Sequence, residues 1–162
     1  MVSSFKRALF ATAIFAVGST GADAKTLMPS SLWAGTWQLN VGTSKLSSPA
    51  GKRSEVRVYA LDGNNLTVNA TGTDANGKPM NYSYFGPFDG KPHKMVGNPV
   101  GDSIALTLVT PLSANATVRK GSVVTATAKS NISSDGKHLT LTRTTLHGKA
   151  AFTTDVLAFD KK

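Results

Sequence analysis

The sequence predicts an all-β fold: a single antiparallel up-and-down β-barrel of about eight to ten strands. Short segments alternate apolar and polar residues, and Gly, Asn and Asp mark turns between them at regular spacing. One sequence motif also occurs twice, at residues 62–68 and again at residues 135–141. Each copy begins with Asp-Gly and is followed by a Gly-Lys pair. Asp-Gly and Asn-Gly accept the positive φ angles that tight hairpins need, so these phrases indicate strands joined by short turns.

The expected strands follow one another as hairpin partners. In the first, Trp37, Leu39 and Val41 share one face and polar residues take the other, as in a half-buried strand. The nine expected strands are residues 35–41, 54–61, 66–71, 80–85, 104–108, 114–120, 122–132, 139–146 and 151–159. Residues 89–92 and 97–99 are expected to form turns, and His93 is expected to lie in a loop.

The sheet is expected to close into a barrel because its edge strands would otherwise be unpaired. An open meander leaves two strands with unpaired backbone groups, and closing the sheet into a barrel removes both edges. The interior of a barrel of this size is filled by side chains or holds one small ligand.

The N-terminus has the features of a signal peptide over residues 1–24. Lys6 and Arg7 precede a short apolar run, and a small-x-small pattern ends at Ala24, where cleavage is expected. Residues 25–162 would then form one barrel domain in the periplasm or outside the cell. The apolar run is shorter than the roughly 20 residues that a membrane span takes, so a membrane-spanning protein is not expected.

The chain is basic, with 18 Lys and Arg against 9 Asp and Glu. The cations are dispersed rather than clustered beside aromatic residues, so a specific nucleic-acid site is not expected. The excess positive charge is explained by solvated surface residues that keep the protein soluble. The alternative is an interaction module that associates weakly with anionic envelope surfaces through its outer face.

Candidate residues for the barrel lining share strand faces. Tyr82, Tyr84 and Met80 lie on one face of a strand, and Val56 and Val58 lie on one face of another. They could line a pocket for a small apolar or amphipathic molecule, or they could simply fill the core.

Catalytic, metal and cofactor sites are not expected. The sequence has no Cys and no nucleophile motif, and most of its Asp residues are explained by turns. His93, His138 and His147 lack a second ligand at a metal-binding spacing. An enzyme is therefore the least favoured class.

Four residues have expected structural roles: Gly35, Trp37, Arg143 and Asp155. Arg143 lies on an apolar face and needs a partner, which could be the Trp37 indole or Asp155 on the next strand. Gly35-Thr36-Trp37 together with a late Arg resembles the lipocalins, in which this Trp closes the barrel floor and the Arg packs across it. Here the Arg is expected on the penultimate strand, not the last.

A closer resemblance covers nearly the whole mature chain. Its motifs are residues 32–40, 44–45, 88–91, 97–99, 102–104, 119–121 and 134–137. They are similar to a family of exported bacterial lipocalin-like proteins. The resemblance implies a lipocalin/calycin-like barrel and an extracytoplasmic location, and it implies no activity.

Overall fold

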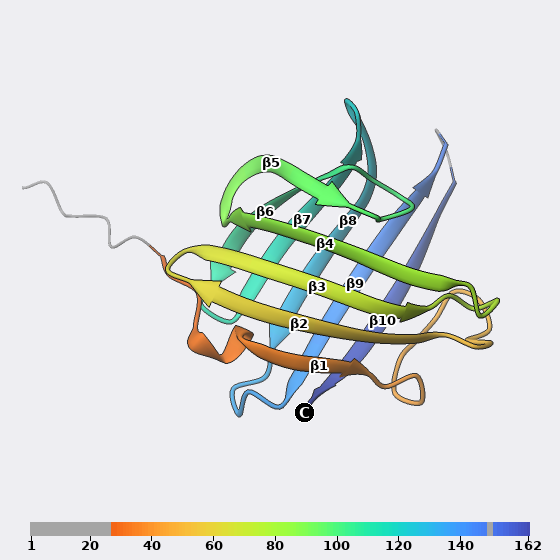
Figure 1. Ribbon diagram of the computed structural model, residues 1–162, viewed down its shortest axis with the longest axis horizontal. Helices are drawn as coiled ribbons and strands as arrows, with labels where there is room; N and C mark the ends of the chain where they lie inside the picture. Colours follow the sequence, from red (N-terminus) through yellow and green to blue (C-terminus); the bar gives the residue numbers. More distant parts are fainter. Residues whose placement is uncertain (1–26, 149–150) are drawn as a thin grey trace, which may run out of the picture.

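Ten antiparallel strands form one closed barrel in the computed structural model, which describes residues 27–148 and 151–162 (Figure 1). The strands are β1 (Gly35–Leu39), β2 (Ser54–Asp62), β3 (Asn65–Thr73), β4 (Pro79–Pro87), β5 (Asp89–Val96), β6 (Ser103–Thr110), β7 (Ser113–Lys120), β8 (Val123–Ile132), β9 (His138–His147) and β10 (Ala151–Lys161). Each strand pairs with its neighbours in sequence, and β1 closes the circle by pairing with both β2 and β10. The predicted up-and-down barrel is confirmed.

The expected signal peptide lies outside the described residues. Within residues 27–148 and 151–162, no helix has the length and apolar character that a membrane span requires.

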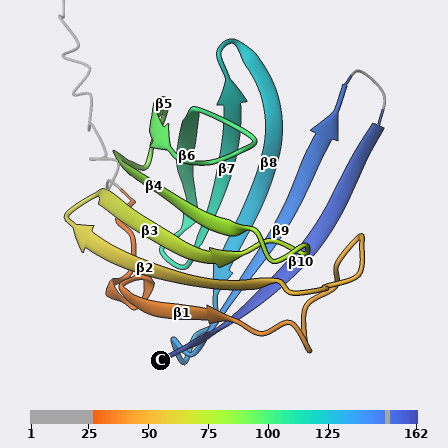
Figure 2. The ribbon, with the colours of Figure 1, turned by 45° about the vertical axis from the view of Figure 1, so that its right-hand side comes forward.

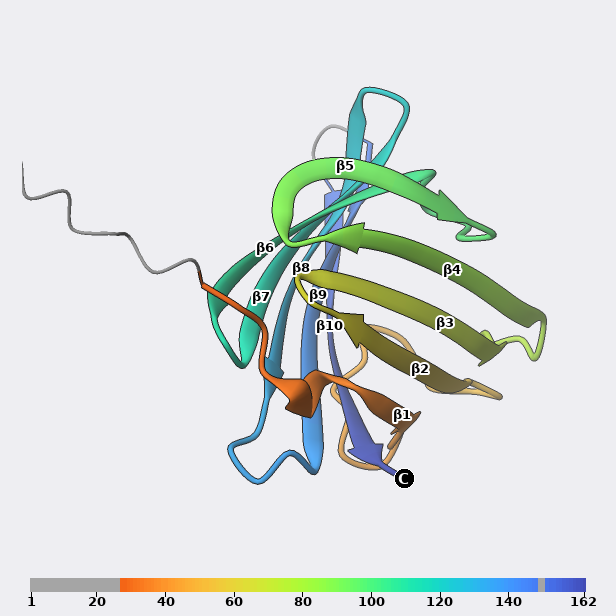
Figure 3. The same cartoon turned by 60° about the vertical axis from the view of Figure 1, so that its left-hand side comes forward.

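The barrel is flattened into two layers. Strands β1 to β4 form one layer and cross the strands of the other, β6 to β10 (Figure 3). The β7–β8 and β9–β10 hairpins rise at the end away from the short 3-10 helix η1 (Ser31–Trp33), as Figure 2 shows. We call the end beside η1 the floor and the opposite end the mouth.

Strand β5 was not expected from the sequence, which predicted a turn at residues 89–92 and a loop at His93. These residues instead pair with β6, with a register shift between Asp89 and Pro92. Gly, Pro and Asp are weak strand formers, so their local preference indicated a turn. Pairing with β6 prevails over that preference.

The repeated Asp-Gly phrase occurs at two hairpins of the floor. Gly63 joins β2 to β3 and Gly136 lies between β8 and β9, with φ angles of 56° and 71°. Only glycine adopts such angles without strain, which explains why the same phrase recurs.

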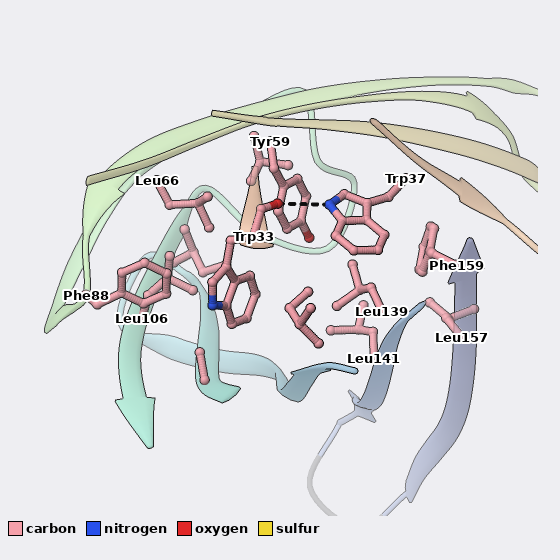
Figure 4. Close-up of a cluster of buried hydrophobic side chains, with 14 of the residues drawn as sticks. Trp33, Trp37, Tyr59, Leu66, Phe88, Leu106, Leu139, Leu141, Leu157 and Phe159 are labelled. Carbon is pink, nitrogen blue, oxygen red and sulfur yellow. Dashed lines mark hydrogen bonds between the residues drawn. The ribbon is translucent and has the colours of Figure 1, made fainter. Parts of the chain in front are cut away.

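The hydrophobic core lies at the floor, between the two layers (Figure 4). Trp33 from η1 stacks on Tyr59 with ring centroids 6.4 Å apart and lies against Phe88 at 5.8 Å. The largest fully buried side chains are Trp33, Trp37, Phe159, Leu66, Ile132, Leu139, Leu157 and Val68. They fill the floor of the barrel and leave the rest of the interior to other residues.

Two indole hydrogen bonds fasten the floor. The Trp33 Nε1–H donates to the backbone oxygen of Pro111 at 2.8 Å. The Trp37 Nε1–H donates to the backbone oxygen of Trp33 at 3.0 Å, the dashed line in Figure 4. A buried indole needs such a partner, and here the partners tie η1 to β1 and to the β6–β7 turn.

The cation over Trp37 is Lys161 of β10. Its Nζ lies 4.9 Å from the ring centroid and donates to the backbone oxygen of Leu32 at 3.0 Å. Gly35 makes room for it, because a Cβ there would stand 2.5 Å from the Lys161 Cε. The lipocalin-like alternative for Arg143 is therefore wrong: the last strand supplies the cation, and Arg143 lies elsewhere.

Replacing Lys161 with methionine is expected to lower the free energy of unfolding by about 1 kcal/mol, since the indole loses its cation and Leu32 its donor. Urea unfolding followed by tryptophan fluorescence measures the change. Lys162→Met is the matched control, because that neighbouring side chain is exposed. Equal effects of the two variants would contradict the assigned role of Lys161.

Candidate functional site

A cavity of about 70 Å³ lies between the floor and the mouth. Its volume is several times the roughly 10–15 Å³ that one water molecule needs, so the interior is not packed solid. One wall is apolar and comes from β6, β7 and β8. The other comes from β2 and β4 and is polar. The lining residues are Arg57, Tyr59, Tyr82, Tyr84, Met95, Asn98, Val100, Ile104, Leu106, Ala116, Val118, Ala126, Ala128, Ser130, Leu141 and Arg143.

Tyr82 and Tyr84 line this cavity from β4, the face that the sequence assigned to them. Met80 lies two residues before Tyr82, on the same face of β4 and nearer the mouth, where it pairs with Gly72 of β3. It does not line the cavity. The structure therefore brings together two of the three residues expected from this strand.

The expectation that Val56 and Val58 face the interior is wrong. Val58 is 46% exposed, whereas Glu55, Arg57 and Tyr59 on the alternate face of β2 are buried. The apolar side of a strand normally faces the core, and β2 reverses this pattern. It does so because its charged residues find partners inside the barrel.

A buried ion pair lies beside the cavity. The Arg57 Nε–H donates to Glu55 Oε1 at 2.7 Å, and the Tyr82 hydroxyl donates to the same oxygen at 2.6 Å. Arg57 also donates from Nη1 to the Tyr59 hydroxyl and lies 4.7 Å from the centroid of the Phe159 ring. These contacts offset the cost of taking two charges out of water.

The protonation states in this cluster are set by burial and by the ion pair. Burial alone raises the pKa of the Glu55 carboxyl, but the positive charge of Arg57 and the Tyr82 hydrogen bond outweigh burial and lower that pKa. Burial is the main cause that raises the pKa of the Tyr82 and Tyr84 hydroxyls. Glu55 is therefore ionised near neutral pH, and both tyrosines are neutral.

A second ion pair lies closer to the mouth. Arg143 and Asp155 are register partners on β9 and β10, and the Arg143 Nη2–H donates to Asp155 Oδ2 at 2.9 Å. This is the Asp155 alternative that the sequence left open for Arg143. The backbone N–H and the hydroxyl of Ser47 donate to the other oxygen, and Arg53 approaches at 3.9 Å.

Asp155 is held in its charged form. Burial raises the pKa of its carboxyl, and the hydrogen bonds from Ser47 and Arg143 outweigh burial, so that the pKa is lowered. Ser47 belongs to the long loop between β1 and β2, so this carboxylate attaches the loop to the barrel wall.

The three histidine side chains do not form a cluster. His93 contacts Asp89, His138 contacts Asp160, and His147 contacts the Thr153 hydroxyl. No group of three His, Cys, Asp or Glu side chains that could hold a metal occurs in the described part of the chain.

Sequence reasoning missed Glu55 and Arg57. The available signal was their spacing: Glu55, Arg57 and Tyr59 alternate with the valines, and Glu55 is the sole Glu of the chain. An i, i+2 pair of opposite charge beside a Tyr on the same face can be buried as a unit.

The comparisons with known proteins agree with the fold. No protein-family model matches the sequence, and no curated protein matches it either. Among solved structures, the zebrafish ileal bile acid-binding protein complexed with cholic acid is similar at 14% identity and a TM-score of 0.53, over 82% of this chain and 100% of that one.

Two further structures are similar at TM-scores below 0.5. The protein Rv2717c from M. tuberculosis matches at 15% identity and a TM-score of 0.49, over 82% of this chain and 94% of that one. A redesigned β-barrel, mFAP1, bound to DFHBI matches at 16% identity and 0.45, over 80% and 95%. The chain therefore has the fold of a closed antiparallel β-barrel, similar to that of the zebrafish protein.

Proposed function

We propose that this protein binds a small amphipathic molecule inside its barrel. The observation that carries the proposal is the cavity, in which an apolar wall from β6 to β8 faces a polar wall of Arg57 and tyrosines from β2 and β4. Pockets of this kind hold the apolar part of a ligand by burial and orient it with a few polar groups. The similar zebrafish barrel, which is complexed with cholic acid, supports the proposal.

The polar side chains of the cavity wall are held in place by bonds to one another, so their arrangement does not depend on a ligand. Glu55, Arg57 and Tyr82 satisfy one another by hydrogen bonds. The floor below is sealed by Trp33 and Trp37. A ligand would therefore enter through the mouth, and its binding would leave the barrel's own polar contacts in place.

Native mass spectrometry of the protein purified from its own source tests the proposal. We expect a mass excess that disappears on denaturation and belongs to one small molecule. Delipidated protein should then bind octanoate in calorimetric titrations. A chain that carries no bound molecule and takes up no amphipathic probe would contradict the proposed function.

Filling the cavity is expected to abolish binding. In Ala116→Leu the larger side chain projects into the cavity, and octanoate affinity is expected to fall by roughly tenfold or more, since the space for the ligand is lost. Overpacking should cost about 1–3 kcal/mol of stability, which urea unfolding measures.

Asn115→Leu is the matched control, because Asn115 is the preceding residue of β7 and its side chain is exposed on the outer face. It should bind octanoate like the unchanged protein. If both variants bound equally well, the cavity would not be the binding site.

We also infer that the protein works outside the cytoplasm, in the periplasm or the medium. The support is the sequence of residues 1–24, with its basic start, apolar run and small-x-small end. N-terminal sequencing of the protein from its own source is expected to begin at Lys25. A chain that retains Met1 in the cytoplasmic fraction would refute this location.

A further inference from the structure

Arg143 differs from Arg57, the other charged residue that lines the cavity, because most of its donors have no acceptor among the described residues. We propose that the ligand carries a carboxylate and that Arg143 binds it near the mouth. The proposal rests on the proposed function and names the chemical class of its ligand.

The hydrogen bonding of Arg143 is incomplete. A guanidinium has five N–H donors. Among the described residues, Arg143 donates one hydrogen bond, from Nη2 to Asp155, and its Nε is buried without a partner. Leaving a buried donor without a partner is unfavourable, so an acceptor placed there is favoured.

Arg57 does not offer the same opportunity. It lies deeper, and its Nε and Nη1 already donate to Glu55 and Tyr59. An anion at Arg57 would displace Glu55 from its ion pair and leave a second carboxylate buried. Of the two arginines that line the cavity, Arg143 is therefore the one that can accept an anion without breaking an existing contact.

The charge balance around the cavity points the same way. Arg57 is matched by Glu55, whereas Asp155 is shared between Arg143 and Arg53. One positive charge is therefore left over where the cavity meets the mouth. A ligand with a single negative charge neutralises it, and a neutral ligand does not.

The geometry of the groups selects the class of anion. The planar guanidinium fork matches a carboxylate, which accepts two parallel hydrogen bonds. The apolar residues Ile104, Leu106 and Val118 line the same cavity and suit the alkyl or ring portion of such a molecule. The ligand is thus an amphipathic carboxylate with its charged end toward the mouth.

The test compares octanoate with 1-octanol, which differ in the head group alone, by calorimetric titration of the delipidated full-length mature chain. The unchanged protein is expected to bind octanoate at least tenfold more tightly. Arg143→Met should weaken octanoate binding roughly ten- to hundredfold, the range for losing hydrogen bonds to a charged group. Its affinity for 1-octanol should change less than twofold.

Two control variants separate this contact from general effects. Arg119→Met removes a positive charge at the end of β7, where Arg119 donates to the backbone of Ser122 and does not line the cavity, so octanoate affinity should be kept. Arg143→Lys keeps the charge without the fork and should bind octanoate with intermediate affinity. Circular dichroism checks that each variant is folded.

The outcomes distinguish the two proposals. If both probes bind equally and Arg143→Met leaves octanoate binding unchanged, the carboxylate assignment is wrong while the proposed function stands. If neither probe binds the unchanged protein, both proposals fail together.

Discussion

Glu55→Gln is expected to lower the free energy of unfolding by about 3–5 kcal/mol, since it leaves the buried Arg57 charge without a counterion. Glu55 is the acceptor for both Arg57 and the Tyr82 hydroxyl, so one carboxylate satisfies two interior groups. Urea unfolding followed by circular dichroism measures the loss. A change below about 1 kcal/mol would show that water or another residue compensates for the lost charge.

A double variant identifies the cause of the loss. Changing Glu55 and Arg57 together to methionine removes both charges, and the double change should cost less than the sum of the two single changes. Strictly additive effects would mean that the two side chains do not act as a pair.

The pH dependence of stability follows from the same pair. Because the pKa of Glu55 is lower in the folded than in the unfolded protein, its contribution to stability is fully present above its unfolded pKa. The contribution is lost as the pH falls through the folded pKa. Between neutral pH and acid, the unchanged protein should therefore lose more stability than Glu55→Gln does.

The second large effect is expected at the floor. Trp37→Ala should lower the free energy of unfolding by about 3–5 kcal/mol, since it leaves a cavity and removes the partner of Lys161. Trp37 is 0% exposed and its indole donates to the backbone of Trp33, so the loss also loosens η1. Urea unfolding followed by circular dichroism gives the value.

Phe152→Ala is the control for this variant. Phe152 is an aromatic residue on β10 that is 67% exposed, so its removal should change stability by less than about 0.5 kcal/mol. A Trp37→Ala variant as stable as Phe152→Ala would mean that the floor does not hold the barrel together.

The turns and the alternation of the strands were enough to predict the barrel. Asp-Gly pairs fix hairpins through backbone geometry alone, and this information is local in the sequence. Strand β5 escaped prediction because its stability comes from pairing with β6, which no local pattern records. Its Gly90 and Pro92 favour a turn when they are considered without that partner.

The site was predicted less well than the fold, and β2 shows why. Periodicity correctly separates Val56 and Val58 from Glu55 and Arg57, but it does not say which set is inside. The assignment by hydrophobicity fails here because the interior contains a mutually satisfied ion pair. On β9 and β10, by contrast, the alternation puts Arg143 and Asp155 on the same side of two neighbouring strands. Their contact could therefore be predicted.

The pairing of β1 with β10 has a consequence for how the chain becomes folded. Trp37 pairs with Lys161, so the circle of strands closes between segments near opposite ends of the described chain. Contacts so distant in sequence form late, because the intervening chain must be ordered first. A chain still emerging from the ribosome has no tenth strand with which to close. Until β10 has been synthesised, the barrel stays open between β1 and β9.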